Sequence, residues 1–161
     1  MKKYLLPLLV MTLLLAACGG GGFNPEKAAK ESKQALKDFF SLYENGESIA
    51  SLNNGEIKNA VDKKMIDYFT DDFKKEVYQA IDNRKEYNKS YQSESAFFLN
   101  TKIKEKKTTF RNIYEITDYR INEEQKQVLL RIDATESTLR DSALKIEMVL
   151  KDGGWKINKV S

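Results

Sequence analysis

The sequence predicts an α+β fold in which about three N-terminal helices pack on a curved antiparallel sheet of about four to five strands. Apolar residues recur at helical spacing from residue 24 to about residue 88, and at a period of two after Ser95. Turn sequences between the period-two segments favour antiparallel neighbours. A run of helices followed by a run of strands is typical of helices layered on one sheet face.

A first helix is predicted to begin at Pro25, because Asn24 is a suitable N-cap and proline is favoured at the first helical position. The opposite face of this segment is charged, and Asn45-Gly46 is a left-handed stop signal. The apolar positions of the predicted helix are Ala28, Ala29, Ala35, Leu36, Phe39, Phe40 and Tyr43.

Two further helices are predicted between Ser48 and Asn88, each with its own apolar row. The first row contains Ile57, Val61 and Met65, and the second contains Phe73, Val77, Ala80 and Ile81. The pattern is interrupted at Asn53-Asn54-Gly55 and at Thr70-Asp71-Asp72. Thr70 can cap the helix that follows it, and the two aspartates suit the positive end of that helix.

Strands are predicted from residue 97 onward. The alternation is weak over Phe97–Lys104, clearer over Thr108–Ile121, and clear over Val128–Ala134 and Leu144–Leu150. Turns are predicted at Asn122-Glu123-Glu124-Gln125 and at Asp152-Gly153-Gly154, where the glycines are expected to supply positive φ. In the final strand, Trp155, Ile157 and Lys159 are expected on one face and Lys156, Asn158 and Val160 on the other, with Trp155 in the core.

The N-terminus has the pattern of a secretory signal peptide. Lys2 and Lys3 precede fourteen uncharged residues, Tyr4 to Ala17. This apolar stretch is shorter than the roughly 18 to 20 residues that a membrane-spanning helix requires, so removal is favoured over retention.

The sequence Leu15-Ala16-Ala17-Cys18 resembles the lipobox of bacterial lipoproteins. The resemblance implies that residues 1–17 are removed and that membrane lipid is attached to Cys18. The alternative is an ordinary signal peptide beside an incidental cysteine. Cys18 is the only cysteine, so no intramolecular disulfide can form, and a lipidated sulfur leaves no thiol for catalysis or metal binding.

Residues 18–23 are interpreted as the lipidated cysteine and a short glycine-rich tether, and residues 24–161 as a single domain. Two of the 27 basic residues lie in the signal peptide, which leaves 25 against 24 acidic residues, a mature side-chain charge of +1. That balance argues against nucleic acid as a partner.

The order of elements, the Pro-Glu-Lys-Ala-Ala opening after the glycines and the closing Lys-Asp-Gly-Gly-Trp-Lys-Ile resemble small lipoproteins of the nuclear-transport-factor-2-like superfamily. The resemblance implies a cone formed by a curved sheet around a long helix. In that superfamily the cone is a ligand pocket, an enzyme site or a filled core, and fold analogy does not choose among them. The aromatic residues expected to line or fill the cone are Phe39, Phe40, Tyr43, Tyr68, Phe69 and Phe73.

The protein contains no histidine, which excludes Ser-His-Asp and Cys-His sites and imidazole metal ligands. Asp71-Asp72, Glu123-Glu124, Asp118 and Asp133 are the visible carboxylate candidates, and solvated charge accounts for them as well. Asp118-Tyr119 supplies the residue types of a ketosteroid isomerase-like site without its spacing. No nucleotide-binding or EF-hand motif is present, and no catalytic residue, cofactor or metal is expected.

Two further segments have alternative interpretations. The run Lys102-Ile103-Lys104-Glu105-Lys106-Lys107 either contacts anionic lipid or an acidic partner, or is a soluble strand edge guarded by lysine. The aromatic residues Tyr87, Tyr91, Phe97 and Phe98 belong either to a protein interface or to the core.

The sequence therefore predicts a non-enzymatic envelope lipoprotein, held by lipid on Cys18, that binds an envelope or incoming protein. A self-protection protein of the immunity type is one specific form. The alternative is a small-molecule-binding or isomerase-like protein with a cone-shaped pocket. By analogy with lipoprotein sorting, Gly19 after the cysteine is compatible with the outer membrane of a Gram-negative host.

Overall fold

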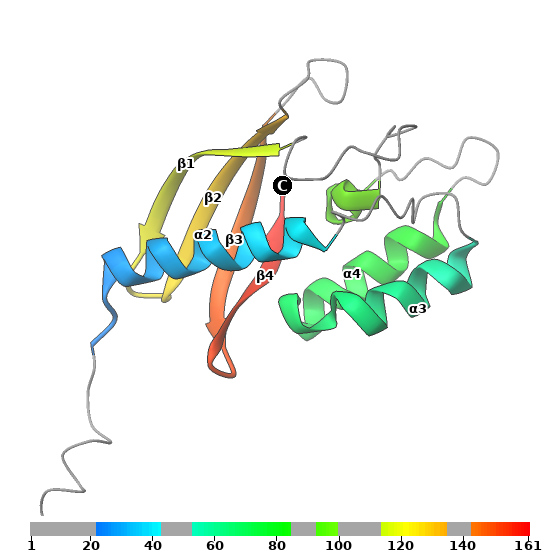
Figure 1. Cartoon of the computed structure of the whole chain (residues 1–161), viewed down its shortest axis with the longest axis horizontal. Coiled ribbons are helices and arrows are strands. Elements are labelled where there is room, and N and C mark those ends of the chain that lie inside the picture. The colour runs from blue at the N-terminus through cyan, green and yellow to red at the C-terminus, as the bar shows by residue number, and fades with distance from the viewer. Residues whose placement is uncertain (1–21, 43–52, 85–92, 100–113, 135–142) are drawn as a thin grey trace, which may run out of the picture.

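The computed structural model describes residues 22–42, 53–84, 93–99, 114–134 and 143–161 (Figure 1). These ranges contain α2 (Pro25–Ser41), α3 (Asn54–Lys64) and α4 (Asp71–Asp82), with short 3₁₀ segments η2 (Ile66–Tyr68) and η3 (Glu94–Leu99). The strands are β1 (Tyr114–Asn122), β2 (Gln127–Ala134), β3 (Leu144–Lys151) and β4 (Gly154–Val160). The predicted α+β class, helices before strands, is confirmed.

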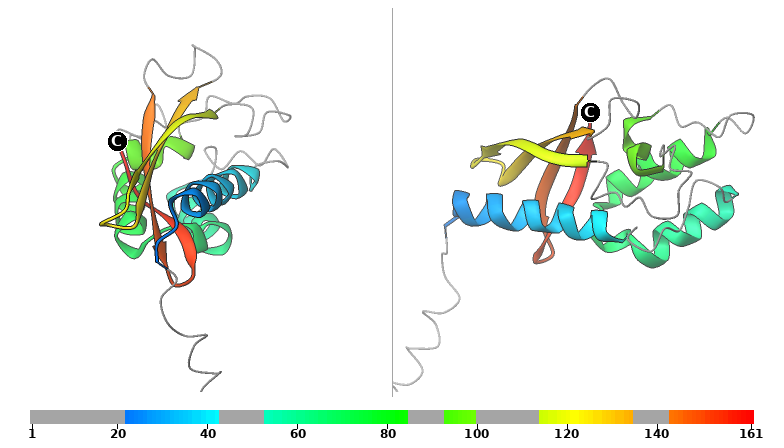
Figure 2. Two further views of the ribbon diagram at one scale, coloured as in Figure 1. Left: turned by 90° about the vertical axis from the view of Figure 1, so that its left-hand side faces the viewer. Right: turned by 45° about the horizontal axis from the view of Figure 1, so that its top comes forward.

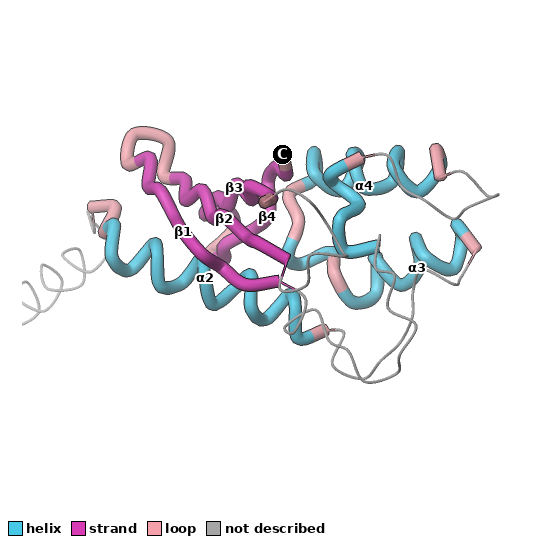
Figure 3. Tube along the Cα trace, turned by 90° about the horizontal axis from the view of Figure 1, so that it is seen from above, coloured by secondary structure: helices cyan, strands magenta, loops and turns pink. Residues whose placement is uncertain are grey.

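The four described strands form one antiparallel sheet in the order β1-β2-β3-β4. Helix α2 runs across one face of this curved sheet, whereas α3 and α4 lie side by side beyond β4 (Figures 1, 2 and 3). Phe69, between η2 and α4, forms a parallel bridge with Ile157 of β4. The expectation that the helices cover one sheet face therefore holds for α2, while the α3–α4 pair extends the fold sideways.

Side-chain caps fix where the helices begin. The Oδ1 atom of Asn24 accepts from the Lys27 amide at 2.9 Å, and Thr70 Oγ1 accepts from the Phe73 amide at 3.2 Å. Asn53 and Glu56 form a reciprocal capping box, so Asn53-Asn54-Gly55 opens a helix. The cap predictions for Asn24 and Thr70 are confirmed; Asn45-Gly46 lies outside the described residues.

The alternation predicted for the two central strands is confirmed. Every second residue of each strand faces α2 and is buried: Val128, Leu130 and Ile132 in β2, and Leu144, Ile146 and Met148 in β3. Leu150, near the end of β3, is the exception, because it is 48% exposed.

A β-bulge in β4 overturns part of the face assignment for the last strand. Met148 pairs with Ile157, but Glu147 pairs with Lys159, so Asn158 is the extra residue. The extra residue shifts the side-chain phase, which buries Val160 with Trp155 and Ile157 and leaves Lys159 exposed. The burial of Trp155 is confirmed, and its indole Nε1 donates to Glu31 Oε2 of α2 at 3.3 Å.

The strand predicted at Phe97–Lys104 is wrong over Phe97–Leu99, which belong to η3. Five consecutive residues, Ser95 to Leu99, are buried there, and a strand with one solvent face cannot bury adjacent side chains. Phe97 and Phe98 are therefore core residues, which removes them as interface candidates. Tyr87, Tyr91 and residues 100–104 lie outside the described residues.

An aromatic cluster centred on Phe39 of α2 forms the middle of the core. The Phe39 ring centroid lies 5.5 Å from those of Phe69 and Phe98 and 6.3 Å from that of Phe97. Next to it, Phe40 stacks on Tyr114 of β1 at 6.0 Å. Of the aromatic residues expected to line or fill a cone, those described contact one another and pack in or against the core: Phe39, Phe40, Tyr68, Phe69 and Phe73. Tyr43 lies outside the described residues.

We expect Phe39→Ala to lower the free energy of unfolding by about 3 to 5 kcal/mol, because it removes a fully buried ring that several elements share. Urea unfolding measures this loss. Lys37→Ala, an exposed change on the same helix, is the matched control and should change it by no more than about 0.5 kcal/mol. Equal effects would show that the cluster is not packed as described.

The turn between β3 and β4 allows two neighbouring glycines with different backbone conformations to be compared. Asp152 and Gly153 have φ values of 53° and 79°, the left-handed conformation of a two-residue hairpin loop, whereas Gly154 is an ordinary strand residue. We expect Gly153→Val to cost roughly 1 to 2 kcal/mol of stability. Gly154→Val should cost little, because an added Cβ meets no atom within 4 Å. Thermal melts in which both substitutions have the same effect would contradict this turn.

Candidate functional site

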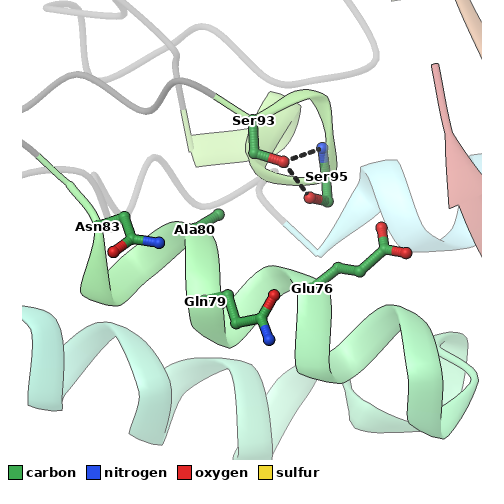
Figure 4. Close-up of a pocket in the computed structure, with 6 residues that line it drawn as sticks. All are labelled: Glu76, Gln79, Ala80, Asn83, Ser93 and Ser95. Carbon is green, nitrogen blue, oxygen red and sulfur yellow. Dashed lines mark hydrogen bonds between the residues drawn. The ribbon is translucent and has the colours of Figure 1, made fainter.

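An open polar depression of about 590 Å³ lies between α4 and η3 (Figure 4). Glu76, Gln79 and Asn83 line it from one face of α4, together with Ala80. The depression lies at the end of the molecule opposite the start of α2 (Figure 1). Its sequence signal is the polar spacing along α4, but Ser93 and Ser95 precede the predicted strand and no local pattern indicates that they face α4.

The opposite wall of this depression is a serine pair. Ser93 Oγ and Ser95 Oγ are 2.5 Å apart, and the Ser95 amide donates to Ser93 Oγ at 3.3 Å. Ser95 is buried, but activation of a serine nucleophile requires a base bonded to it, and among the described residues no lysine or carboxylate is hydrogen-bonded to either hydroxyl. The depression is lined by amide and hydroxyl groups and by one carboxylate, that of Glu76. These groups can hydrogen-bond a neutral polar group.

The carboxylates singled out from the sequence lie apart on the surface. Asp71 and Asp72, in the first turn of α4, pair with Lys151 at 3.3 Å and with Lys75 at 2.9 Å. Glu123 and Glu124 are exposed in the β1–β2 turn. In the part of the chain that the structure describes, no group of three or more histidine, cysteine or carboxylate residues is placed to hold a metal ion.

Asp118 and Tyr119 do not form the isomerase-type pair considered from the sequence, because adjacent strand residues point to opposite sheet faces. Lys33 of α2 lies 3.5 Å above the centre of the Tyr119 ring, which places Tyr119 on the helix side. Asp118 stands opposite Arg131 in the strand register, on the outer side of the sheet. Asp133 is also on that outer side, where it accepts from Thr117 Oγ1 at 2.6 Å.

The outer sheet face, which is the side of the sheet turned away from α2, has a small hollow of about 110 Å³. It is lined by Asp118, Tyr119, Arg120, Leu129, Arg131 and Lys145. Three of these side chains are cationic and one is a carboxylate. Sequence reasoning did not find this group, because its members come from three strands and are brought together only by the strand register.

A polar network joins α3 to α4. Asp62 accepts hydrogen bonds from Lys74 Nζ at 2.8 Å and from the Tyr78 hydroxyl, and these bonds lower its pKa. The bond to Asp62 raises the pKa of Lys74, and burial raises that of Tyr78. Lys58 of α3 also pairs with Asp82 of α4 at 2.5 Å. All these groups have partners within the network, so it links the helices structurally.

Comparison with family models, curated proteins and solved structures finds no match to this chain. Cys18 and the Lys102–Lys107 run lie outside the described residues. Among the helices that are described, none is both long enough and apolar enough to cross a membrane.

The lowered pKa of Asp62 makes the stability of the α3–α4 pair dependent on pH. Its contribution is complete above the unfolded-state pKa of about 3.9 and is lost as the pH falls through the lower folded-state value. We expect Asp62→Asn to cost no more than about 1 kcal/mol at pH 7, because the pair is half exposed. The difference in unfolding free energy between Asp62→Asn and wild type should narrow below about pH 4.

Urea unfolding at pH 7 and below about pH 4 measures this difference in unfolding free energy. Asp67→Asn is the control, because Asp67 is exposed and forms no ion pair with another described residue. A gap for Asp62→Asn that stays constant between the two pH values would contradict the assigned network.

Proposed function

We propose that this chain is a lipid-anchored lipoprotein of the bacterial cell envelope whose domain acts as a non-enzymatic binding module. The observation that carries the proposal is the short distance from the lipobox cysteine to the folded domain. Phe23 already packs against the core, and Asn24 caps α2. Only Gly19–Gly22 separate Cys18 from the first packed residue.

Such a tether fixes which parts of the domain can approach the bilayer. Four glycines span about 11 Å on average, so the start of α2 stays close to the lipid headgroups. The α4–η3 depression lies at the other end of the molecule (Figure 2). It therefore remains accessible to a partner approaching from outside the membrane.

The filled interior supports recognition at the surface. The rings of Phe39, Phe69 and Phe98 pack at centroid distances of 5.5 to 5.7 Å, where a cone-pocket protein needs space for its ligand. The lack of histidine and the scattered carboxylates weigh against catalysis. A protein partner at the envelope, such as an incoming protein in a self-protection role, suits these features better than an apolar small molecule.

We expect Cys18→Ser to abolish lipid attachment, because serine has no thiol to form the thioether. Cells expressing either form are labelled with a radioactive fatty acid and fractionated. Wild type should carry label in the membrane fraction, and the variant should be unlabelled and largely lost from that fraction. Equal label in both forms would contradict the anchor.

Crosslinking in intact envelopes tests the binding role. With the full chain at its natural level, we expect a reproducible crosslinked protein that diminishes for Cys18→Ser. No adduct, together with a saturable shift of the emission of Trp155 by a small apolar compound, would replace the proposal with the pocket alternative. Trp155 is the only tryptophan, so its emission is unambiguous.

A further inference from the structure

We infer that the outer face of the sheet, centred on Arg120, Arg131 and Lys145, is the docking surface for an acidic protein segment. This inference rests on the proposed binding function and identifies the surface and the chemistry of its partner. The face is the side of the sheet turned away from α2, which covers the other side (Figures 1 and 3).

The strand register assembles the charges in two neighbouring rows. Asp118, Arg131 and Lys145 form one row across β1, β2 and β3, and Arg120, Leu129 and Glu147 form the next. The buried residues of β2 point toward α2, namely Val128, Leu130 and Ile132. The alternate residues Leu129 and Arg131 therefore point outward. Three cations therefore surround the small hollow above Leu129.

These cations are incompletely neutralised. Arg131 pairs with Asp133 at 3.4 Å, but neither Arg120 nor Lys145 takes part in an ion pair with another described residue. Glu147, beside them, instead accepts from the amide of Asn158 at 2.6 Å. Arg131 and Lys145 are directly opposite each other, and like charges in that position destabilise a sheet. An acidic partner would relieve this repulsion.

The size of the hollow favours a side chain over a free small molecule. Its volume of about 110 Å³ is well below the roughly 300 to 1,000 Å³ of ordinary small-molecule sites. It has space for a carboxylate side chain from a larger surface. Leu129 and Val149 are half buried on the same face and supply apolar contact beside the charges.

The mixture of charges favours a protein over an anionic bilayer. The outer sheet face has five cations, because the register places Lys156 and Lys159 of β4 on the same side as Arg120, Arg131 and Lys145. It also has four carboxylates, namely Glu115, Asp118, Asp133 and Glu147. A uniformly negative membrane would repel them, whereas a protein surface can place acidic groups at the hollow and avoid its rim. The chemistry therefore fits an acidic segment of limited width.

Binding of a labelled acidic peptide to the full lipidated chain in a nonionic detergent tests this inference. The probe is a fluorescein-labelled peptide of alternating glutamate and alanine, measured by anisotropy at about 0.05 M salt, where charge attraction is weakly screened. The test variant combines Arg120→Gln, Arg131→Gln and Lys145→Gln. The control combines Lys30→Gln, Lys37→Gln and Lys63→Gln, which remove equal charge from exposed helical positions.

We expect the test variant to bind the peptide at least about tenfold more weakly than wild type, and the control to change by less than about twofold. Equal losses in both variants would show an effect of net charge alone and overturn the inference. Absence of peptide binding by wild type would overturn it too. Displacement of the peptide by lower concentrations of glycerol phosphate than of glutamate would assign the face to lipid headgroups and also contradict it.

A charge reversal separates recognition from folding. Lys145→Glu faces Arg131 across the strands, so its melting temperature should equal or exceed that of wild type, while peptide binding is lost. Lys145→Arg should retain binding. A large drop in the melting temperature of Lys145→Glu would indicate a structural role and overturn the inference.

Envelope crosslinking of the triple test variant distinguishes this inference from the proposed function. Loss of the wild-type adduct, with membrane attachment retained, supports the outer sheet face. An adduct that persists in the variant overturns the face and leaves the binding function standing. Absence of an adduct for both chains removes the binding function and this inference together.

Discussion

The contacts of Phe39 are the constraint on which the rest of this structure depends. This residue of α2 touches Phe69 at the entrance to α4, Phe97 and Phe98 of η3, and Tyr68 of η2. Because protein interiors are close-packed, one shared ring fixes the relative positions of all these elements. Phe97 in turn lies 5.9 Å from Tyr114 of β1, which connects the cluster to the sheet.

A second link, at Thr70, determines where the helix pair attaches. Its hydroxyl caps α4 and donates to Asn158 Oδ1 at 3.1 Å, while its amide donates to the Ile157 carbonyl at 3.0 Å. Asn158 is available for this contact because the bulge in β4 inserts it as an extra residue. A single local irregularity therefore buries Val160 and also joins α4 to the sheet.

The filled core and the short predicted tether are the two features behind the proposal that this chain recognises a partner through its surface. The two hollows described differ in chemistry. The α4–η3 depression offers amides and hydroxyls, whereas the outer sheet face offers cations next to apolar side chains. We propose the second as the recognition surface, since a charged surface also excludes partners that place like charges against it.

Local chemistry made much of the fold predictable. Asn24, Pro25 and Thr70 have capping roles that depend only on neighbouring residues, and the alternation in β2 and β3 reflects burial on one face. The errors arose where tertiary contacts override local pattern. Phe97 and Phe98 are buried together by Phe39, and no local signal indicates the bulge that buries Val160.

The candidate sites were less predictable for the same reason. Asp118 and Tyr119 are adjacent in sequence, and the pleat separates them. Arg120, Arg131 and Lys145 are distant in sequence, and only the register of three strands brings them to one hollow. Period-two patterns identify a strand and its buried face, but they do not specify which residues of neighbouring strands stand opposite each other.

Site-specific photocrosslinking in intact envelopes tests the central claim most directly. A photoreactive benzoylphenylalanine replaces Leu129 on the outer sheet face, and in parallel chains it replaces Gln79 in the α4–η3 depression or Lys30 on α2. We expect a discrete protein adduct from position 129 and none from position 30. Adducts from position 79 or 30 without one from position 129 would contradict it.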